Sequence, residues 1–118
     1  MTMSDSLSVR RLLSPLLAVL MGLALGGCGA VIPRVTPELV VAAQQYDPVV
    51  DSDRLEHARN LYVTRCGSCH SLNDPRDYTA QEWPDWMRKM ARKAKLTSAQ
   101  ERSLLVFVLA ARDLPPPP

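Results

Sequence analysis

Two thiols and an imidazole stand close together in the middle of this chain, at Cys66, Cys69 and His70 in the run Cys-Gly-Ser-Cys-His. This C-x-x-C-H spacing is that of the box to which haem is attached covalently. The two sulfurs are spaced to bond the two vinyl groups of one haem, and the imidazole that follows is placed to bind the iron. Because the box occurs once, the sequence predicts one covalent haem, whose iron would carry the chemistry.

Three other uses of such a box fit this chain less well. A structural zinc site needs four ligands, and the only further cysteine and histidine are Cys28 and His57. A thioredoxin-type redox pair belongs to a βαβ unit, and the sequence has no strand pattern. A plain disulfide between Cys66 and Cys69 would leave His70 without a role.

The N-terminal segment has the layout of a secretory signal. Arg10 and Arg11 precede an interrupted apolar stretch over residues 12–25, which is too short for a typical membrane span. The stretch ends in Leu25-Gly26-Gly27-Cys28, which resembles the lipobox of bacterial lipoproteins. In that family the leader is cut before the cysteine, and its sulfur receives a diacylglycerol. The alternative is an ordinary signal peptide that contains a cysteine.

Export of this kind predicts a bacterial periplasmic protein, held by lipid at Cys28 to a membrane, the outer rather than the inner. The periplasm is an oxidising compartment in which haem can be attached. The expected organisation is a leader over residues 1–27, a lipid-anchored tether over 28–50, a helical domain over 51–114 and a proline tail over 115–118. Within the tether, Thr36 as N-cap and Pro37 in the first turn favour a short helix over 38–45.

The domain is predicted to be all-α, with three main helices and one core. The first helix begins near Ser52 or Asp53 and runs for about 14 residues, a usual length. Leu55, Ala58 and Tyr62 recur in it at helical spacing and form an apolar face. The box therefore lies at the C-terminal end of an amphipathic helix.

Two capping boxes predict the starts of the other two helices. Thr79 and Glu82 mark the second, although Pro84 lies deep for a first-turn proline. Thr97 and Gln100 mark the third, which covers residues 98–112 and is apolar all round over 104–111. A helix that is apolar on every side is buried, so the third helix is expected in the core.

In this order of elements, residues 51–112 resemble a class I c-type cytochrome, and in particular a small monohaem member anchored as a lipoprotein. The resemblance implies a cytochrome c-like domain around one covalent haem, with the first and last helices crossing at one haem edge. The segment from Tyr78 through Trp83 to Met90 is similar to the stretch that carries the distal methionine in small members of the family. One departure is that many members place this methionine much farther from the box.

The iron ligands are assigned by the box and by this resemblance. His70 is the expected proximal ligand, and its other ring nitrogen is expected to donate to a carbonyl of the loop around Pro75. The resemblance makes Met90 the first choice for the distal ligand and Met87 the second, and either thioether would raise the reduction potential relative to a second imidazole. An iron without a distal protein ligand is the third possibility, and His57 is expected to be exposed.

The charge of the chain argues against a nucleic-acid partner. The formal net charge is only +2, and Asp5, Arg10 and Arg11 would leave with the leader. Five basic residues nevertheless gather in and after the second helix, and they predict either a docking rim for an acidic redox partner or a solvated face: Arg88, Lys89, Arg92, Lys93 and Lys95.

The sequence thus predicts a membrane-tethered electron-transfer protein that carries one electron per haem between protein redox partners, and not an enzyme. Two alternatives stay open. One is a haem protein with an open sixth position that binds or senses a small ligand. The other is the haem subunit of a larger oxidoreductase complex.

Overall fold

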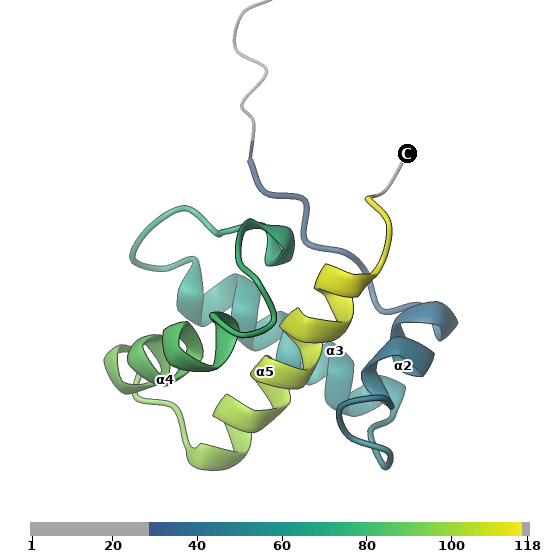
Figure 1. Ribbon diagram of the computed structural model, residues 1–118. Coiled ribbons are helices and arrows are strands. Elements are labelled where there is room, and N and C mark those ends of the chain that lie inside the picture. Colours follow the sequence, from purple (N-terminus) through teal and green to yellow (C-terminus); the bar gives the residue numbers. More distant parts are fainter. Residues whose placement is uncertain (1–28, 117–118) are drawn as a thin grey trace, which may run out of the picture.

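The fold is built around its last and longest helix, α5, against which the other helices pack (Figure 1). The computed structural model describes residues 29–116, so the predicted leader and Cys28 lie outside the described residues. The prediction of an all-α protein is confirmed, since residues 29–116 contain helices and no strand. The α-helices are α2 (Pro37–Ala43), α3 (Ser52–Leu61), α4 (Trp83–Lys93) and α5 (Ser98–Asp113).

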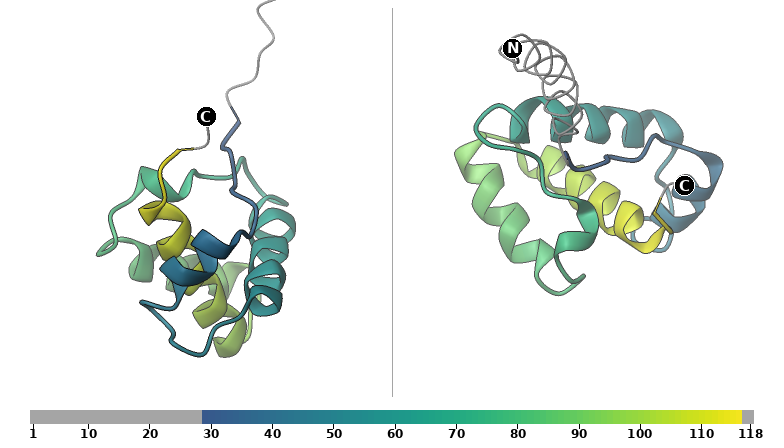
Figure 2. Two further views of the ribbon diagram at one scale, coloured as in Figure 1. Left: turned by 90° about the vertical axis from the view of Figure 1, so that its right-hand side faces the viewer. Right: turned by 90° about the horizontal axis from the view of Figure 1, so that it is seen from above.

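Two shorter elements connect these helices. A π-helical turn, η1 (Tyr62–Cys66), continues directly from α3, and a 3₁₀ turn, η2 (Pro75–Asp77), lies in the connection to α4. In Figure 2 the connection between η1 and α4 forms a wide loop along one side of the helices. The C-x-x-C-H box of the sequence therefore lies where α3 ends and this loop begins.

The helix starts are set by polar side chains. Thr36 accepts a hydrogen bond from the Leu39 amide at 3.3 Å, with Pro37 in the first turn of α2, as predicted. The predicted capping box of Thr97 and Gln100 is also present at the start of α5. Such caps satisfy backbone amides that have no partner inside the helix.

Two of the predicted starts are shifted. Asp51, not Ser52 or Asp53, caps α3 by accepting a hydrogen bond from the Arg54 amide at 2.9 Å. Thr79 and Glu82 bond to each other, but they form a turn before α4. The helix itself begins at Trp83, and this places Pro84 in its first turn, where a missing amide costs nothing.

The expected tether over residues 28–50 is wrong for most of its length, because the packed region begins near residue 32. Leu39 and Ala43 on α2 are fully buried against the core. Ile32 and Val35, which precede α2, also pack against it. These apolar side chains pack against the core, and α2 contacts α5, so α2 is a fourth helix of the domain.

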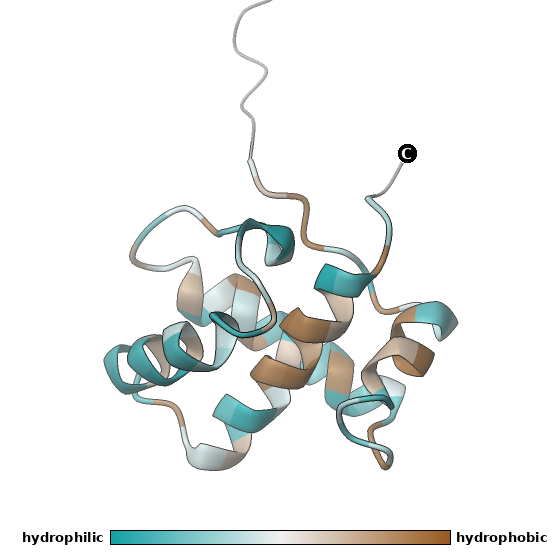
Figure 3. Cartoon of the chain, viewed as in Figure 1, coloured by the Kyte–Doolittle hydropathy of each residue, from teal (hydrophilic) through white to brown (hydrophobic). Residues whose placement is uncertain are grey.

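The core centres on α5, as the unbroken apolar run in its sequence predicts. Its residues Leu104, Phe107 and Val108 have no exposed surface, and they meet Leu55 and Ala58 of α3. The hydropathy colouring of Figure 3 shows the apolar residues of α5 at the centre of the fold and hydrophilic residues along much of α4. Within residues 29–116, no helix is both long and apolar enough to span a membrane.

Candidate functional site

A cavity of about 580 Å³ lies between the box and α4. It is bounded on one side by η1 and the loop after the box, and on the other by the inner face of α4. Most of its wall is apolar or aromatic. Its lining residues that bear on chemistry are Tyr62, Arg65, Cys66, Cys69, His70, Trp83, Trp86, Met87, Met90, Lys93 and Lys95.

The π-helical turn positions the two thiols of the box. Cys66 ends the turn and is half-buried, whereas Cys69 is exposed in the loop that follows. Burial raises the pKa of the Cys66 thiol. Both cysteines are free thiols that line the same cavity.

Gly67 is required by the close approach of the chain to itself after this turn. Its backbone angles suit any residue, with φ at −72°. A Cβ atom at this position would, however, overlap the carbonyl oxygen of Val63. The residue directly after the π turn must therefore lack a side chain.

His70 is oriented by its own neighbour in the chain. Its Nδ1 lies 2.7 Å from the carbonyl oxygen of Ser71. Since a carbonyl only accepts, Nδ1 carries the proton and Nε2 holds the lone pair that could bind a metal. The expected partner, a carbonyl of the Pro75 loop, is wrong: the Pro75 carbonyl accepts instead from the Trp83 indole at 2.8 Å.

Two aromatic side chains hold the loop that follows the box. The Trp83 indole bonds Pro75, and the Tyr62 hydroxyl donates to the Asn73 carbonyl at 2.7 Å. The two rings also meet edge to face, with their centroids 6.5 Å apart. Burial raises the pKa of Tyr62 far above its usual value, so its hydroxyl keeps its proton and remains a donor. The back wall of the cavity is thus fixed from both η1 and α4.

Both candidate methionines line the cavity from α4, opposite the box. Met87 is only 3% exposed and belongs to the hydrophobic core. Met90 is half-buried and lies one turn farther along the same face, outside that core. The structure therefore brings Met90, Met87 and His70 to one cavity, as expected, and places His57 on the exposed surface of α3.

The charged residues of the cavity wall are all basic. Lys93 and Lys95 come from the basic cluster that the sequence indicates, and Arg65 comes from η1. Sequence reasoning missed Arg65, although its position directly before Cys66 was a usable signal. Elsewhere in the cluster, Arg88 pairs with Asp85 at 3.1 Å and the Lys89 ammonium lies 4.9 Å from the centre of the Trp86 ring.

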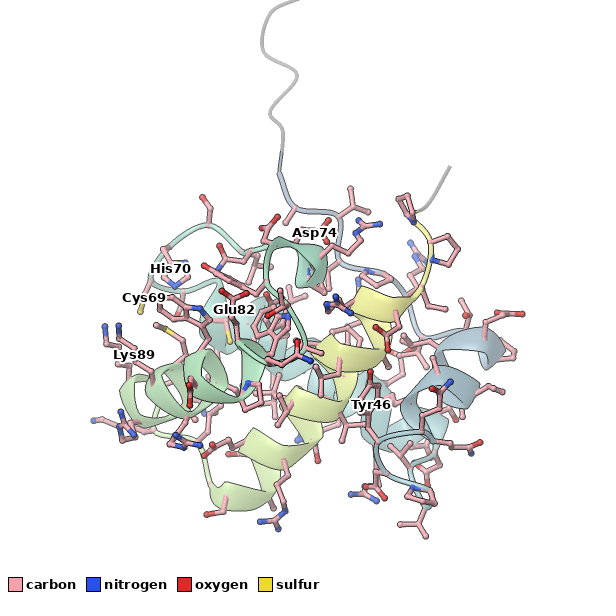
Figure 4. The ribbon with its side chains drawn as sticks, viewed as in Figure 1. Tyr46, Cys69, His70, Asp74, Glu82 and Lys89 are labelled. Atoms are coloured by element: carbon pink, nitrogen blue, oxygen red, sulfur yellow. The ribbon has the colours of Figure 1, made fainter. Side chains whose placement is uncertain are left out.

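The side chains of the box do not converge as a metal-ion site would. Among residues 29–116, no group of three or more histidine, cysteine, aspartate or glutamate side chains is placed to hold a metal ion. Figure 4 shows Cys69 and His70 side by side at the end of the molecule where Lys89 also lies. What the box residues share is the cavity wall.

No protein-family model, curated protein or solved structure matches this chain.

Proposed function

We propose that this cavity binds one covalent haem and that the protein carries one electron per haem between redox partners. Cys66 and Cys69 would form the two thioether bonds, and His70 would bind the iron through Nε2. The domain would then be a small cytochrome c-like fold. The observation that carries the proposal is that both thiols, the imidazole and two thioethers line one apolar cavity.

The residues present fit this cofactor in size and in chemistry. The cavity volume of about 580 Å³ is within the range of ~300–1,000 Å³ that is usual for sites of small molecules and cofactors. Its wall is mostly apolar, as a macrocycle requires, and Arg65, Lys93 and Lys95 offer positive charge to the two carboxylates of a haem. When bound, the haem supplies an iron that alternates between the ferrous and ferric states.

The protein's own groups would tune and shield that iron. The hydrogen bond from His70 Nδ1 to Ser71 fixes the ring and makes Nε2 a stronger donor. Trp83 and Met87 are buried in the wall and exclude water. Met90 is the better distal ligand, because Met87 already packs in the core, whereas Met90 is half-buried and lies outside the core.

The place of action is proposed from the N-terminal sequence. A leader cut before Cys28 and a lipid on that cysteine would hold the domain at a membrane in the bacterial periplasm, the outer rather than the inner. The basic residues around the cavity favour protein partners with acidic faces. No substrate-converting group is assigned, so the protein is proposed as an electron carrier and not an enzyme.

Absorption spectra of the purified full chain test this proposal, with Met90→Leu and Met87→Leu as a matched pair of variants. Leucine keeps the volume of methionine but cannot bind iron. We expect a covalent haem spectrum in all three proteins. The ferric sulfur-to-iron charge-transfer band should be present in the parent and in Met87→Leu and absent in Met90→Leu, whose ferrous form should bind carbon monoxide.

Each other result has a definite meaning. Loss of the band in Met87→Leu alone would move the distal ligand to Met87. Rapid carbon monoxide binding by the parent, with no band, would replace electron transfer by small-ligand binding at an open sixth position. A chain that takes up no haem through Cys66 and Cys69 would overturn the proposal. Co-purification with a larger oxidoreductase would identify the protein as its haem subunit.

A further inference from the structure

Residues 32–35 lie just before α2 and form a strap that Arg59 holds to the domain. The Arg59 Nε donates to the Pro33 carbonyl at 2.8 Å, and Nη2 donates to the Ile32 carbonyl at 3.4 Å. The side chain of Ile32 packs against the core, as does that of Val35. The backbone is therefore held from residue 32 onward, both by hydrogen bonds to a guanidinium and by apolar contact.

This strap leaves very little free chain before the predicted lipid site. Only Gly29, Ala30 and Val31 separate Cys28 from Ile32. Four Cα–Cα steps at the fullest extension span about 14 Å. A free tether over the whole of residues 28–50 would instead have reached tens of ångströms.

The strap leaves the domain on a face that does not contain the cavity. Pro33 shares a small hollow with Arg76 of η2 and with Pro115, so the strap, η2 and the C-terminal end form one face. In Figure 4 the chain enters beside Asp74 at the top, whereas Cys69, His70 and Lys89 lie at the left. The residues around the cavity therefore lie to one side of the strap face and not on it.

We infer that the linker between the lipid and the domain is short, so that the domain lies within about 14 Å of the membrane that holds its lipid. The strap face is then turned toward the lipid, and the cavity opens along the membrane surface. This rests on the proposed lipidation of Cys28. The partner that fits such a geometry is a redox protein bound to the same membrane. A carrier on a long flexible linker could instead reach a partner on another membrane.

Neutron reflectometry of the lipidated holoprotein on a bilayer of phosphatidylethanolamine and phosphatidylglycerol tests the inference. The variant carries a 15-residue Gly/Ser spacer after Gly29, and the control carries the same 15 residues after Pro118. We expect the parent and the control to form a protein layer within about 14 Å of the headgroups. The spacer should move the layer outward by about 20 Å, the mean reach of such a coil.

Two chemical readouts test the orientation on vesicles of the same lipids. Tryptic cleavage after Arg34, in the strap, should be slower on vesicles than in detergent, and the spacer should remove this difference. Acetylation of Lys89, beside the cavity, should proceed equally in both. Arg59→Ala, which releases the strap, should speed cleavage after Arg34 in detergent, and its haem spectrum reports whether it is folded.

The outcomes separate this inference from the proposed function. A parent layer as far from the bilayer as that of the spacer variant would overturn the short linker. Protection of Lys89 in place of Arg34 would overturn the proposed orientation. A haem protein that does not bind the bilayer would remove the lipid anchor, and the inference with it. A chain close to the bilayer but without haem would overturn the proposed electron transfer and leave the inference of a short linker standing.

Discussion

Gly67 is the residue of the box at which the fold leaves no room for a side chain. It follows the π-helical turn that ends at Cys66, and the carbonyl of Val63 occupies the space that a Cβ would need. The constraint is one of volume, since its φ lies in the ordinary region. A glycine is therefore needed here for close approach and not for an unusual turn.

Gly67→Ala should consequently destabilise the turn and misplace the two thiols. Overpacking of this kind costs about 1–3 kcal/mol, so we expect a lower midpoint in denaturant and a reduced yield of covalent haem. Gly29→Ala is the matched control, because nothing lies within 4 Å of a Cβ at that position. Equal stability and haem yield in the two variants would show that the Val63 carbonyl moves aside at no cost.

The box itself could be read from the sequence, but the partners of its side chains could not. A C-x-x-C-H spacing is local, and so is its meaning. The bond from Trp83 to Pro75 depends on where the loop at residues 71–78 returns, and His70 bonds its neighbour Ser71 instead of that loop. Trp83 is a buried donor that must find an acceptor, and it takes the Pro75 carbonyl, which belongs to the loop from which a partner for His70 was expected.

At the scale of elements, local signals were the reliable ones. The caps at Thr36 and Thr97 were predicted from side chains that act within one turn. The Thr79 and Glu82 pair makes the hydrogen bonds of a capping box but encloses a turn, because Pro84 fixes the start of α4 later. The burial of α2 was missed, since a seven-residue helix among prolines shows too little periodicity to predict its packing.

Asp74, at the start of η2, is expected to stabilise the fold by an amount that depends on pH. Its carboxylate caps the turn and pairs with Arg76 at 2.6 Å, and the hydrogen bonds from Arg76 hold the pKa of Asp74 below its ordinary value of 3.8. A lowered pKa in the folded state adds stability above the unfolded value, and this stability is lost as the pH falls through the folded pKa.

Asp74→Asn should therefore lower the free energy of unfolding at pH 7 by about 0.5–1 kcal/mol, since asparagine still caps but carries no charge. The deficit should shrink as the pH falls below about 4. Denaturant titrations from pH 7 to pH 3 measure it. Asp85→Asn, in a more exposed ion pair, is the control and should change little. A deficit in Asp74→Asn that stays constant with pH would contradict the assignment to the ion pair.

At the scale of the whole molecule, charge is uneven although its sum is small. The formal net charge is +2, yet the charged residues of the cavity wall are all basic. The basic side chains that the two carboxylates of the proposed haem do not offset raise the local potential and attract anions at rates that fall with ionic strength. The proposed electron transfer should therefore depend on salt according to the charge of the partner.

Stopped-flow oxidation of the reduced protein by two small oxidants measures this dependence. We expect the rate with ferricyanide, an anion, to fall between about 10 mM and 150 mM salt, and the rate with a cationic cobalt tris-phenanthroline complex to rise or stay level. Lys93→Gln with Lys95→Gln should flatten the ferricyanide response. Arg102→Gln, exposed on α5 and absent from the cavity wall, should not. A salt response that is the same for both oxidants would argue that the rim is only a solvated face.

The position of α5 in the chain determines when the core can be completed during synthesis. It is the last helix, yet α2, α3 and α4 all pack against it. A chain is made from its N-terminus, so residues 29–97 exist for an interval without the apolar surface that completes their core. The box precedes α5, and Cys66 and Cys69 are therefore synthesised before the core can close around them.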